Sequence, residues 1–251
     1  MGLDAEGKVQ LPSECSPSQI IMTILGLIPA RGGSKGIPGK NLVLLHGKPL
    51  LQYTCEAAKQ STMLTRVIVS TDDKKIADVA IGFGIEVPFL RPKELADDGT
   101  PMIDVLLHML AEFKKSGQEP EILVLLQPTS PLRTSKDIDD AVSLLQKTGA
   151  DTVVSVVEVP HQFVPGSLMR LEDGKLHPYG DQQSPLLRQH KQRLYARNGP
   201  AVLAIRTDFL KKAKGFYSGD TRALLMPKER SVDIDDAFDL RLAEMILQQA
   251  Q

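Results

Sequence analysis

Short apolar runs of β-forming residues alternate with longer amphipathic stretches along most of this chain. The runs cover residues 20–28, 66–71, 85–90, 122–126, 152–159 and 201–205, and helical periodicity covers about 48–60, 73–83, 102–115 and 134–147. Residues 122–126 are apolar without interruption, which predicts a central strand covered on both faces. Alternation of this kind predicts an α/β fold with a doubly wound, mostly parallel sheet and right-handed crossovers.

The first apolar run leads directly into a loop rich in glycines and cations, residues 29–41. Glycines let the backbone approach an anion closely, and Arg31, Lys35 and Lys40 would neutralise several phosphates in a row. The spacing excludes a Walker A loop, because Ser34 stands where that motif has its first glycine. The pattern Gly-x-Gly-x-x-Gly is also absent from the loop. We therefore predict a cradle for a nucleoside triphosphate, with a basic surface turn as the alternative.

Polar residues also follow two other predicted strands. Asp72 and Asp73 come after the run 66–71, and residues 127–133 come after the run 122–126. The carboxyl ends of parallel strands meet at one edge of a sheet, so these loops and the glycine-rich loop are expected to converge on one crevice. Asp73 is predicted to cap the next helix. Asp72 either shares that role or faces the crevice.

A second pair of carboxylates precedes the predicted terminal helix. Side chains alternate in an extended chain, so Asp233 and Asp235 are expected to share one face and Val232 and Ile234 the other. Magnesium prefers oxygen ligands and is often held by one or two carboxylates together with substrate phosphates. We therefore predict that Asp233 and Asp235 bind Mg²⁺. The alternative is that these acids cap the terminal helix, a role that residues 236 and 239 can also fill.

Residues 160–198 break the alternation of strands and helices. Prolines recur in this stretch, helical periodicity is weak, and the following basic residues gather near its end: Arg188, His190, Lys191, Arg193 and Arg197. We interpret it as an arm inserted into a single domain, residues 20–251. A long ordered arm with no core of its own usually packs on another subunit, so the sequence predicts a homodimer, and a flexible surface loop is the alternative.

Composition narrows the class of protein. Charged residues make up 24% of the chain and the net charge is -1, so neither nucleic acid nor a membrane surface is predicted as a partner. Cys15 and Cys55 are the only cysteines, which indicates a reducing, cytoplasmic compartment and excludes a zinc cluster. No stretch approaches the ~20 apolar residues of a membrane span. The polar residues 1–19 are predicted to be a disordered leader.

Six short motifs together resemble the CMP-sialic acid synthetase (acylneuraminate cytidylyltransferase) family. They occur in the family's order and cover the chain from about residue 24 to its end. The motifs are the loop 30–41, residues 69–72, residues 90–96, residues 125–133, the tripeptide Arg197-Asn198-Gly199 and residues 231–235. The resemblance implies a Rossmann-like fold of the nucleotide-diphospho-sugar transferase type, with a dimerisation arm inserted late in the chain.

The resemblance also implies a reaction and the residues that serve it. CTP would react with a nonulosonic, sialic-acid-like sugar acid to give the CMP-sugar and pyrophosphate. The implied catalytic residues are Arg31, Lys35, Asp233 and Asp235, the last two as Mg²⁺ ligands. The implied nucleotide-binding residues are Ala30, Arg31, Gly32, Gly33, Lys35, Asn41 and Arg91. The implied sugar-binding residues are Gln127, Thr129, Ser130, Arg188 and Arg197.

The sequence departs from the family pattern on the sugar side. Ala196 stands where the family normally has an arginine, with Arg197 next to it, and residues 159–163 lack the usual double histidine and following lysine. Other acceptors therefore stay open: an eight-carbon 3-deoxy-2-keto acid, legionaminic or pseudaminic acid, or a phosphonate. A non-catalytic nucleotide-binding protein is the alternative from another class. A P-loop ATPase is disfavoured by the loop spacing.

Overall fold

The computed structural model describes residues 22–179, 193–217 and 219–249. The predicted leader 1–19 and the first residues of the run 20–28 therefore lie outside the described residues. Within them, seven strands form the main sheet, with β9 paired to β6 beside the order β11-β6-β10-β5-β1-β4. The bounds of these strands are β1 Ile24–Pro29, β4 Arg66–Ser70, β5 Ile122–Leu125, β6 Thr152–Glu158, β9 Tyr195–Arg197, β10 Leu203–Arg206 and β11 Thr221–Leu225.

Strand direction confirms the predicted fold class. β1 pairs in parallel with β4 and β5, and β11 pairs in parallel with β6. β10 is antiparallel to both β5 and β6, so these two neighbours run the same way. β5 lies between β1 and β10 and is buried along its whole length, as its uninterrupted apolar sequence predicts.

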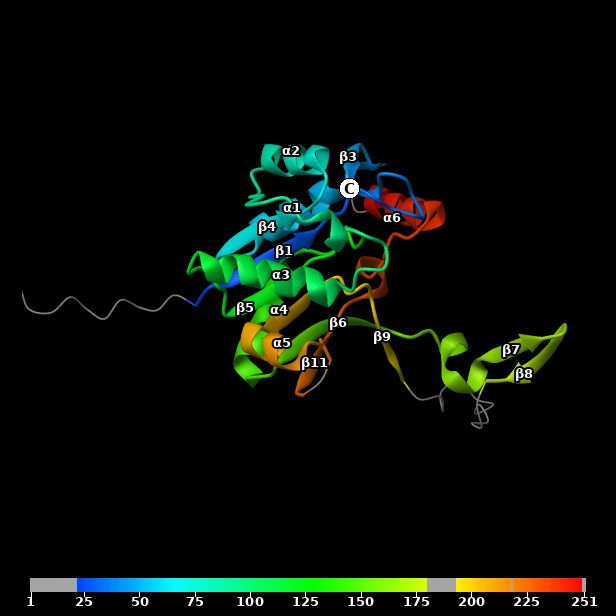
Figure 1. The fold of residues 1–251 in the computed structure, drawn as a ribbon. Coiled ribbons are helices and arrows are strands. Elements are labelled where there is room, and N and C mark those ends of the chain that lie inside the picture. The colour runs from blue at the N-terminus through cyan, green and yellow to red at the C-terminus, as the bar shows by residue number, and fades with distance from the viewer. Residues whose placement is uncertain (1–21, 180–192, 218, 250–251) are drawn as a thin grey trace, which may run out of the picture.

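Helices cover both faces of this sheet (Figure 1). Helices α2, α3, α4 and α6 lie where the sequence predicts them, and the bounds of the helices are α1 Leu50–Gln60, α2 Lys74–Gly82, α3 Met102–Lys115, α4 Ser135–Thr148, α5 Thr207–Ala213 and α6 Ala237–Gln249. Alternate side chains of β1 enter different cores: Ile24 and Ile28 pack with α1, α2 and α4, whereas Leu25 and Leu27 pack with α3 and α5. This three-layer packing fixes the strand ends that carry the site.

Two predictions of local structure are wrong. Residues 85–90 form only a single parallel bridge, from Glu86 to Ile68, instead of a strand. Pro88 has no N–H to donate, so it ends the ladder soon after it begins. The first helix begins at Leu50 and not at Lys48, because β3 (Lys48–Pro49) pairs with β2 (Leu44–Leu45) in a small hairpin.

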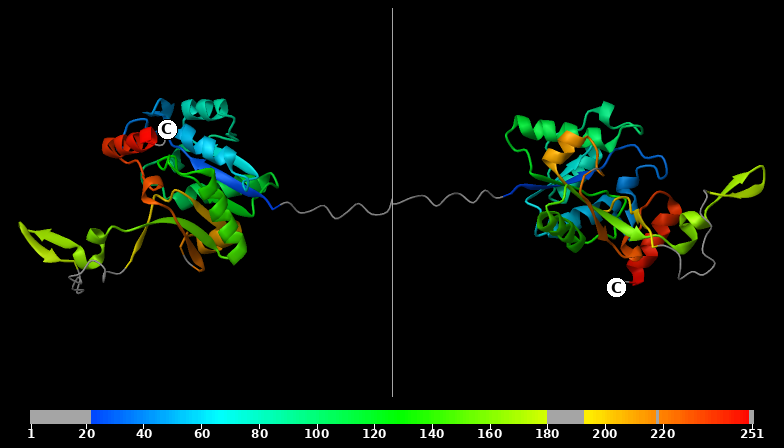
Figure 2. Two further views of the ribbon diagram at one scale, coloured as in Figure 1. Left: turned by 180° about the vertical axis from the view of Figure 1, so that it is seen from behind. Right: turned by 90° about the horizontal axis from the view of Figure 1, so that it is seen from below.

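The segment after β6 leaves the body of the molecule (Figures 1 and 2). It forms a hairpin of β7 (Met169–Glu172) and β8 (Lys175–Pro178), and every residue of these two strands is exposed. The chain returns through β9, which pairs antiparallel with β6. Of the predicted basic set, Arg188, His190 and Lys191 lie outside the described residues, whereas Arg193 and Arg197 lie within them.

No helix in the described parts of the chain combines the length and the apolar character that crossing a bilayer requires.

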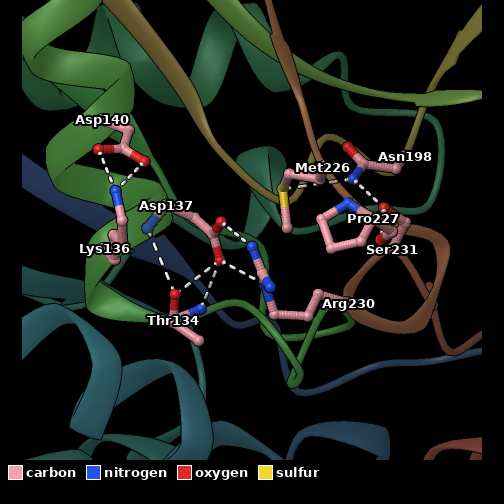
Figure 3. A network of polar contacts seen from close by, with 9 residues as sticks. All are labelled: Thr134, Lys136, Asp137, Asp140, Asn198, Met226, Pro227, Arg230 and Ser231. Atoms are coloured by element: carbon pink, nitrogen blue, oxygen red, sulfur yellow. Dashed lines mark hydrogen bonds and ion pairs between the residues drawn. The ribbon is translucent and has the colours of Figure 1, made fainter.

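Side-chain caps fix the starts of three helices. Asp73 accepts hydrogen bonds from the backbone N–H groups of Lys75 (2.7 Å) and Ile76 (3.4 Å), which confirms its predicted role at α2. Asp236 accepts from the backbone of residues 238 and 239 at the start of α6. At α4, Thr134 and Asp137 cap each other's backbone N–H reciprocally (Figure 3).

Asp137 also accepts two hydrogen bonds from Arg230, at 2.8 and 3.1 Å, and this pairing predicts a pH dependence of stability. Burial alone would raise the pKa of Asp137, but hydrogen bonds from Arg230 and Thr134 outweigh it and lower the pKa below 3.8. A carboxylate with a lowered pKa stabilises the fold above its unfolded pKa, and this contribution is lost as the pH falls through the folded value.

We therefore expect Asp137→Asn to lower the free energy of unfolding by about 2 kcal/mol at neutral pH, and by clearly less at about pH 3. Urea unfolding at both pH values measures the difference. Asp140→Asn is the matched control, because Asp140 lies on the same helix and pairs only with the exposed Lys136. A difference for Asp137→Asn that stays constant with pH would contradict the assignment.

Candidate active site

A cavity of about 450 Å³ opens at the carboxyl ends of β1 and β5. Three segments far apart in the sequence line it together: the glycine-rich loop, the turn after β5, and the extended segment before α6. The lining residues are Pro29, Arg31, Ser34, Lys35, Gly36, Lys40, Asn41, Arg91, Met102, Gln127, Pro128, Thr129, Asp233 and Asp235. The loops after β1 and β5 thus converge as the sequence predicts.

Two contacts hold the glycine-rich loop in shape. Asn41 is buried and donates its side-chain N–H to the carbonyl oxygen of Arg31 at 2.9 Å, which ties the two ends of the loop together. Asp72 accepts a hydrogen bond from the backbone N–H of Gly32 at 3.0 Å. Asp73 alone caps α2, so Asp72 does not share that role, and Asp72 is not among the residues that line the cavity.

Gly36 lies directly against the segment before α6. A Cβ atom at this position would overlap the carbonyl oxygen of Asp235, so no other residue fits without movement of the backbone. The glycine thus lets the glycine-rich loop touch the segment that carries the carboxylate pair.

The three loop cations divide between two partners. Arg31 and Lys35 both form ion pairs with Asp98, with 3.0 Å between Lys35 Nζ and the carboxylate. Lys40 donates from Nζ to the carbonyl oxygen of Ile234 at 2.7 Å and lies 3.2 Å from Asp235 Oδ1. Hydrogen bonds from Lys35 and then Arg31 lower the pKa of Asp98.

Arg91 lies in the wall of the cavity, and its guanidinium is largely committed to the protein. It donates from Nε to Ser70 Oγ (3.2 Å) and from Nη2 to the Ser70 carbonyl oxygen (2.6 Å). Burial lowers its pKa, against the favourable charge of Asp72. Arg91 therefore holds the end of β4 in place beside the cavity.

A buried arginine shapes the turn after β5. Arg133 donates to the carbonyl oxygens of Gln127 and Ser130 and to Thr54 Oγ1. Burial lowers its pKa to about 10, so it stays cationic at neutral pH. Gln127 donates its side-chain N–H to the carbonyl oxygen of Gly199 at 3.0 Å, which links this turn to the one before β10.

The carboxylate pair has the properties of an incomplete cation site. Asp233 Oδ1 is buried, and no described residue offers it a hydrogen bond. Burial raises the pKa of Asp233, Thr129 lowers it through a hydrogen bond, and the nearby charge of Asp235 raises it again. Asp235 is exposed, with 82% of its side chain accessible. An unsatisfied carboxylate oxygen beside a second carboxylate suits a hard divalent cation.

The described residues hold no group of three or more His, Cys, Asp or Glu side chains arranged so that the group could hold a metal ion. Two carboxylates supplemented by substrate phosphates and water would fit the way Mg²⁺ is usually bound. The donor set of Asp233 and Asp235 is therefore compatible with the predicted ion.

Several predicted site residues do not line the cavity. Ala30 and Ser130 are fully buried behind it, and Gly32 and Gly33 contribute backbone to the loop. Arg197 lies on β9 with its guanidinium 4.4 Å from the centre of the Tyr217 ring. Arg188 lies outside the described residues. The roles predicted for these residues toward substrate stay predictions.

Sequence reasoning missed Asp98, Arg133, Met102 and the position of Gly36. Asp98 lies in a loop without periodicity, and its pairing with Arg31 is visible only once the chain is folded. Arg133 was noticed as part of a motif, but its burial follows from packing and not from local pattern.

A family model and several known proteins match this chain along most of its length. The family model described as "Cytidylyltransferase" matches residues 25–249. CMP-N,N'-diacetyllegionaminic acid synthase of Legionella pneumophila is 38% identical over 234 residues, which is 90% of this chain and 97% of that protein. N-acylneuraminate cytidylyltransferase of Escherichia coli is 37% identical over 226 residues, and the match spans 90% of this chain and 52% of that longer protein.

Solved structures show the same fold at lower identity. The structure of CMP:2-keto-3-deoxy-manno-octonic acid synthetase complexed with CTP superposes with a TM-score of 0.70 and 17% identity, covering 91% of this chain and 100% of that one. At this identity the likeness speaks for the fold alone. The family match and the identity to the Legionella and Escherichia proteins go further: the chain belongs to the CMP-sialic acid synthetase (acylneuraminate cytidylyltransferase) family.

Proposed function

We propose that this protein is a CTP-dependent cytidylyltransferase that activates a nonulosonic sugar acid. The anomeric hydroxyl oxygen of the acid attacks the α-phosphorus of CTP, the bond from this phosphorus to the bridging oxygen breaks, and pyrophosphate leaves. The hydroxyl proton passes to solvent. The observation that carries the proposal is one cavity lined by both the loop cations and a carboxylate pair, in a chain of this family.

Positioning and charge neutralisation are the main demands of phosphoryl transfer. Arg31 and Lys35 lie on the loop side of the cavity and are suited to bind the triphosphate oxygens. Their present partner, Asp98, must yield to the incoming phosphates or share the cations with them. Lys40 is held against Ile234 and keeps the opposite wall in place.

Asp233 and Asp235 would hold the Mg²⁺ ion that this proposal includes. When bound, such an ion supplies positive charge to the reacting phosphoryl group and makes a hydroxyl attached to it more acidic. Gln127 and Thr129 lie on the wall formed by the turn after β5, where we place the sugar acid. We assign the reaction to the cytoplasm, in keeping with the free, buried thiol of Cys55.

A panel of substrates tests the activity directly. With Mg²⁺ and CTP we expect pyrophosphate release with at least one acid among N-acetylneuraminate, its deaminated analogue, N,N'-diacetyllegionaminate and pseudaminate. UTP, GTP and ATP serve as nucleotide controls, and the eight-carbon 3-deoxy-2-keto acid serves as the acceptor control. Binding of CTP without turnover on any acid would favour a non-catalytic nucleotide-binding protein, and hydrolysis of ATP without acceptor would favour an ATPase.

Asp235→Asn tests the carboxylate pair. We expect kcat at saturating CTP to fall at least about a hundredfold, which corresponds to about 2.7 kcal/mol of lost transition-state stabilisation. The exposure of Asp235 means that the variant should keep the wild-type melting temperature. Glu229→Gln, which removes an exposed carboxylate a few residues earlier, is the matched control. Retained turnover in Asp235→Asn would disprove the assignment.

We also propose that two copies associate through the hairpin arm. Four apolar or aromatic side chains of the arm are more than half exposed in the single chain: Phe163, Leu171, Leu176 and Tyr179. No described part of the chain covers the apolar surface that they form. Such a surface is typical of an interface.

The double variant L171S/L176S is expected to shift the protein toward monomer in sedimentation velocity. Both residues lie on the exposed hairpin, so folding of the sheet should be unaffected. Leu44→Ser is the matched control, because Leu44 is equally exposed but lies on β2. An unchanged dimer in the double variant would exclude the hairpin as the interface.

A further inference from the structure

The segment that carries the carboxylate pair, residues 231–235, belongs to no helix or strand. Its geometry therefore depends on tertiary contacts. On the C-terminal side, Asp239 accepts hydrogen bonds from the backbone N–H groups of Asp235 (2.9 Å) and Asp236 (3.1 Å). In the middle, Ile234 donates its N–H to the Thr129 carbonyl oxygen at 2.8 Å, and its side chain is fully buried. The N-terminal side is held by a separate set of contacts.

Arg230 provides the first of these contacts (Figure 3). Its guanidinium donates from Nη2 to Asp137 Oδ1 at 2.8 Å and from Nε to Asp137 Oδ2 at 3.1 Å, a forked arrangement that fixes direction as well as distance. Asp137 is 5% exposed and is itself held by Thr134 in the first turn of α4. Arg230 thus binds a carboxylate whose own position is fixed by the start of α4.

Ser231 provides the second contact (Figure 3). Its hydroxyl donates to the Pro227 carbonyl oxygen at 2.9 Å and accepts from Asn198 Nδ2 at 3.0 Å. The other end of the Asn198 amide accepts from the hydroxyl of Ser155 on β6 at 2.6 Å. Arg230 and Ser231 therefore attach the turn before Asp233 to α4 and to the sheet.

We propose that Arg230 is a positioning residue for the cation site: by holding Asp137, it fixes the chain so that Asp233 and Asp235 can bind one divalent cation together. This inference rests on the proposed function, which places the ion there. Metal ligands must be held within about 0.5 Å of their productive geometry. Thr129 hydrogen-bonds the Asp233 carboxylate, but no described residue offers its buried Oδ1 a hydrogen bond, so the placement of this oxygen also depends on the backbone of the segment.

The shape of the guanidinium is part of the inference. A lysine at position 230 could place a charge near Asp137, but it would offer a point contact in place of two parallel hydrogen bonds. Partners outside the ligand shell typically change metal affinity about 10-fold to 100-fold when they are removed. We therefore expect a graded series in which wild type binds best, Arg230→Lys is intermediate and Arg230→Ala is weakest.

Binding of Mn²⁺ to the full chain without nucleotide, followed by electron paramagnetic resonance, tests the inference independently of activity. We expect Arg230→Ala to bind Mn²⁺ about tenfold more weakly than wild type, and Arg230→Lys a few-fold more weakly. The Mg²⁺ concentration that gives half-maximal activity should rise in the same order. Binding of CTP in the presence of a chelator should stay within about twofold of wild type, because Arg31 and Lys35 are untouched.

Lys136→Ala is the matched control. Lys136 lies on α4 beside Asp137 and pairs with Asp140 at 2.7 Å, but this pair is exposed and leads to no site residue (Figure 3). The control should bind Mn²⁺ as wild type does. Arg230→Ala that binds Mn²⁺ as tightly as wild type would overturn the inference, and if this variant does not fold, Arg230→Lys with wild-type affinity would overturn it.

Asp235→Asn separates failure of this inference from failure of the proposed function. If wild type and Asp235→Asn bind Mn²⁺ equally, the carboxylate pair is not the cation site, and both proposals about the metal fail together. If Asp235→Asn loses binding while Arg230→Ala keeps it, the cation site stands and only the positioning role of Arg230 is wrong.

Discussion

The cavity depends on the contact between Lys40 and the segment before α6. Lys40 Nζ lies 2.7 Å from the carbonyl oxygen of Ile234, a residue 194 positions later in the chain. Only 12% of this side chain is accessible, so the ammonium group is held by protein and not by solvent. Gly36 permits the same close approach from the backbone side. These contacts bring cations and carboxylates from opposite ends of the chain to the two walls of one site.

Rigid elements support each wall. The glycine-rich loop starts from β1, whose side chains enter a core on both faces of the sheet. The turn after β5 is held by Arg133, a buried cation whose two Nη atoms donate to the carbonyl oxygens of Gln127 and Ser130 and to the Thr54 hydroxyl. The segment before α6 has no regular secondary structure. Hydrogen bonds from Arg230 to Asp137 and from Asn198 to Ser231 hold it in place instead. Reactions that depend on placement need such support from outside the reacting groups.

Local sequence patterns were enough to predict most of the strands and helices and part of the candidate site. Helical periodicity and the cap at Asp73 depend on neighbours in sequence, so α2 to α4 lie where they were expected. The strand predicted over residues 85–90 is wrong because Pro88 interrupts its pairing with β4, and the sequence does not show which strand these residues would pair with. β11 was not predicted, since most of its residues are exposed and its only partner strand is β6. The ion pair of Arg31 with Asp98 joins two loops, and the sequence of neither loop predicts this contact.

Asp98 supplies an anion from within the chain to two of the cations that line the cavity. Its carboxylate belongs to the same chain as Arg31 and Lys35, so a dissolved anion competes with an intramolecular partner for these cations. A single phosphate or sulfate ion would have to displace it with one set of contacts. Under the proposed function, a triphosphate that engages the loop at several points would meet the same competitor with more contacts than a single anion. The internal carboxylate would then favour a polyphosphate chain over a single phosphate or sulfate ion.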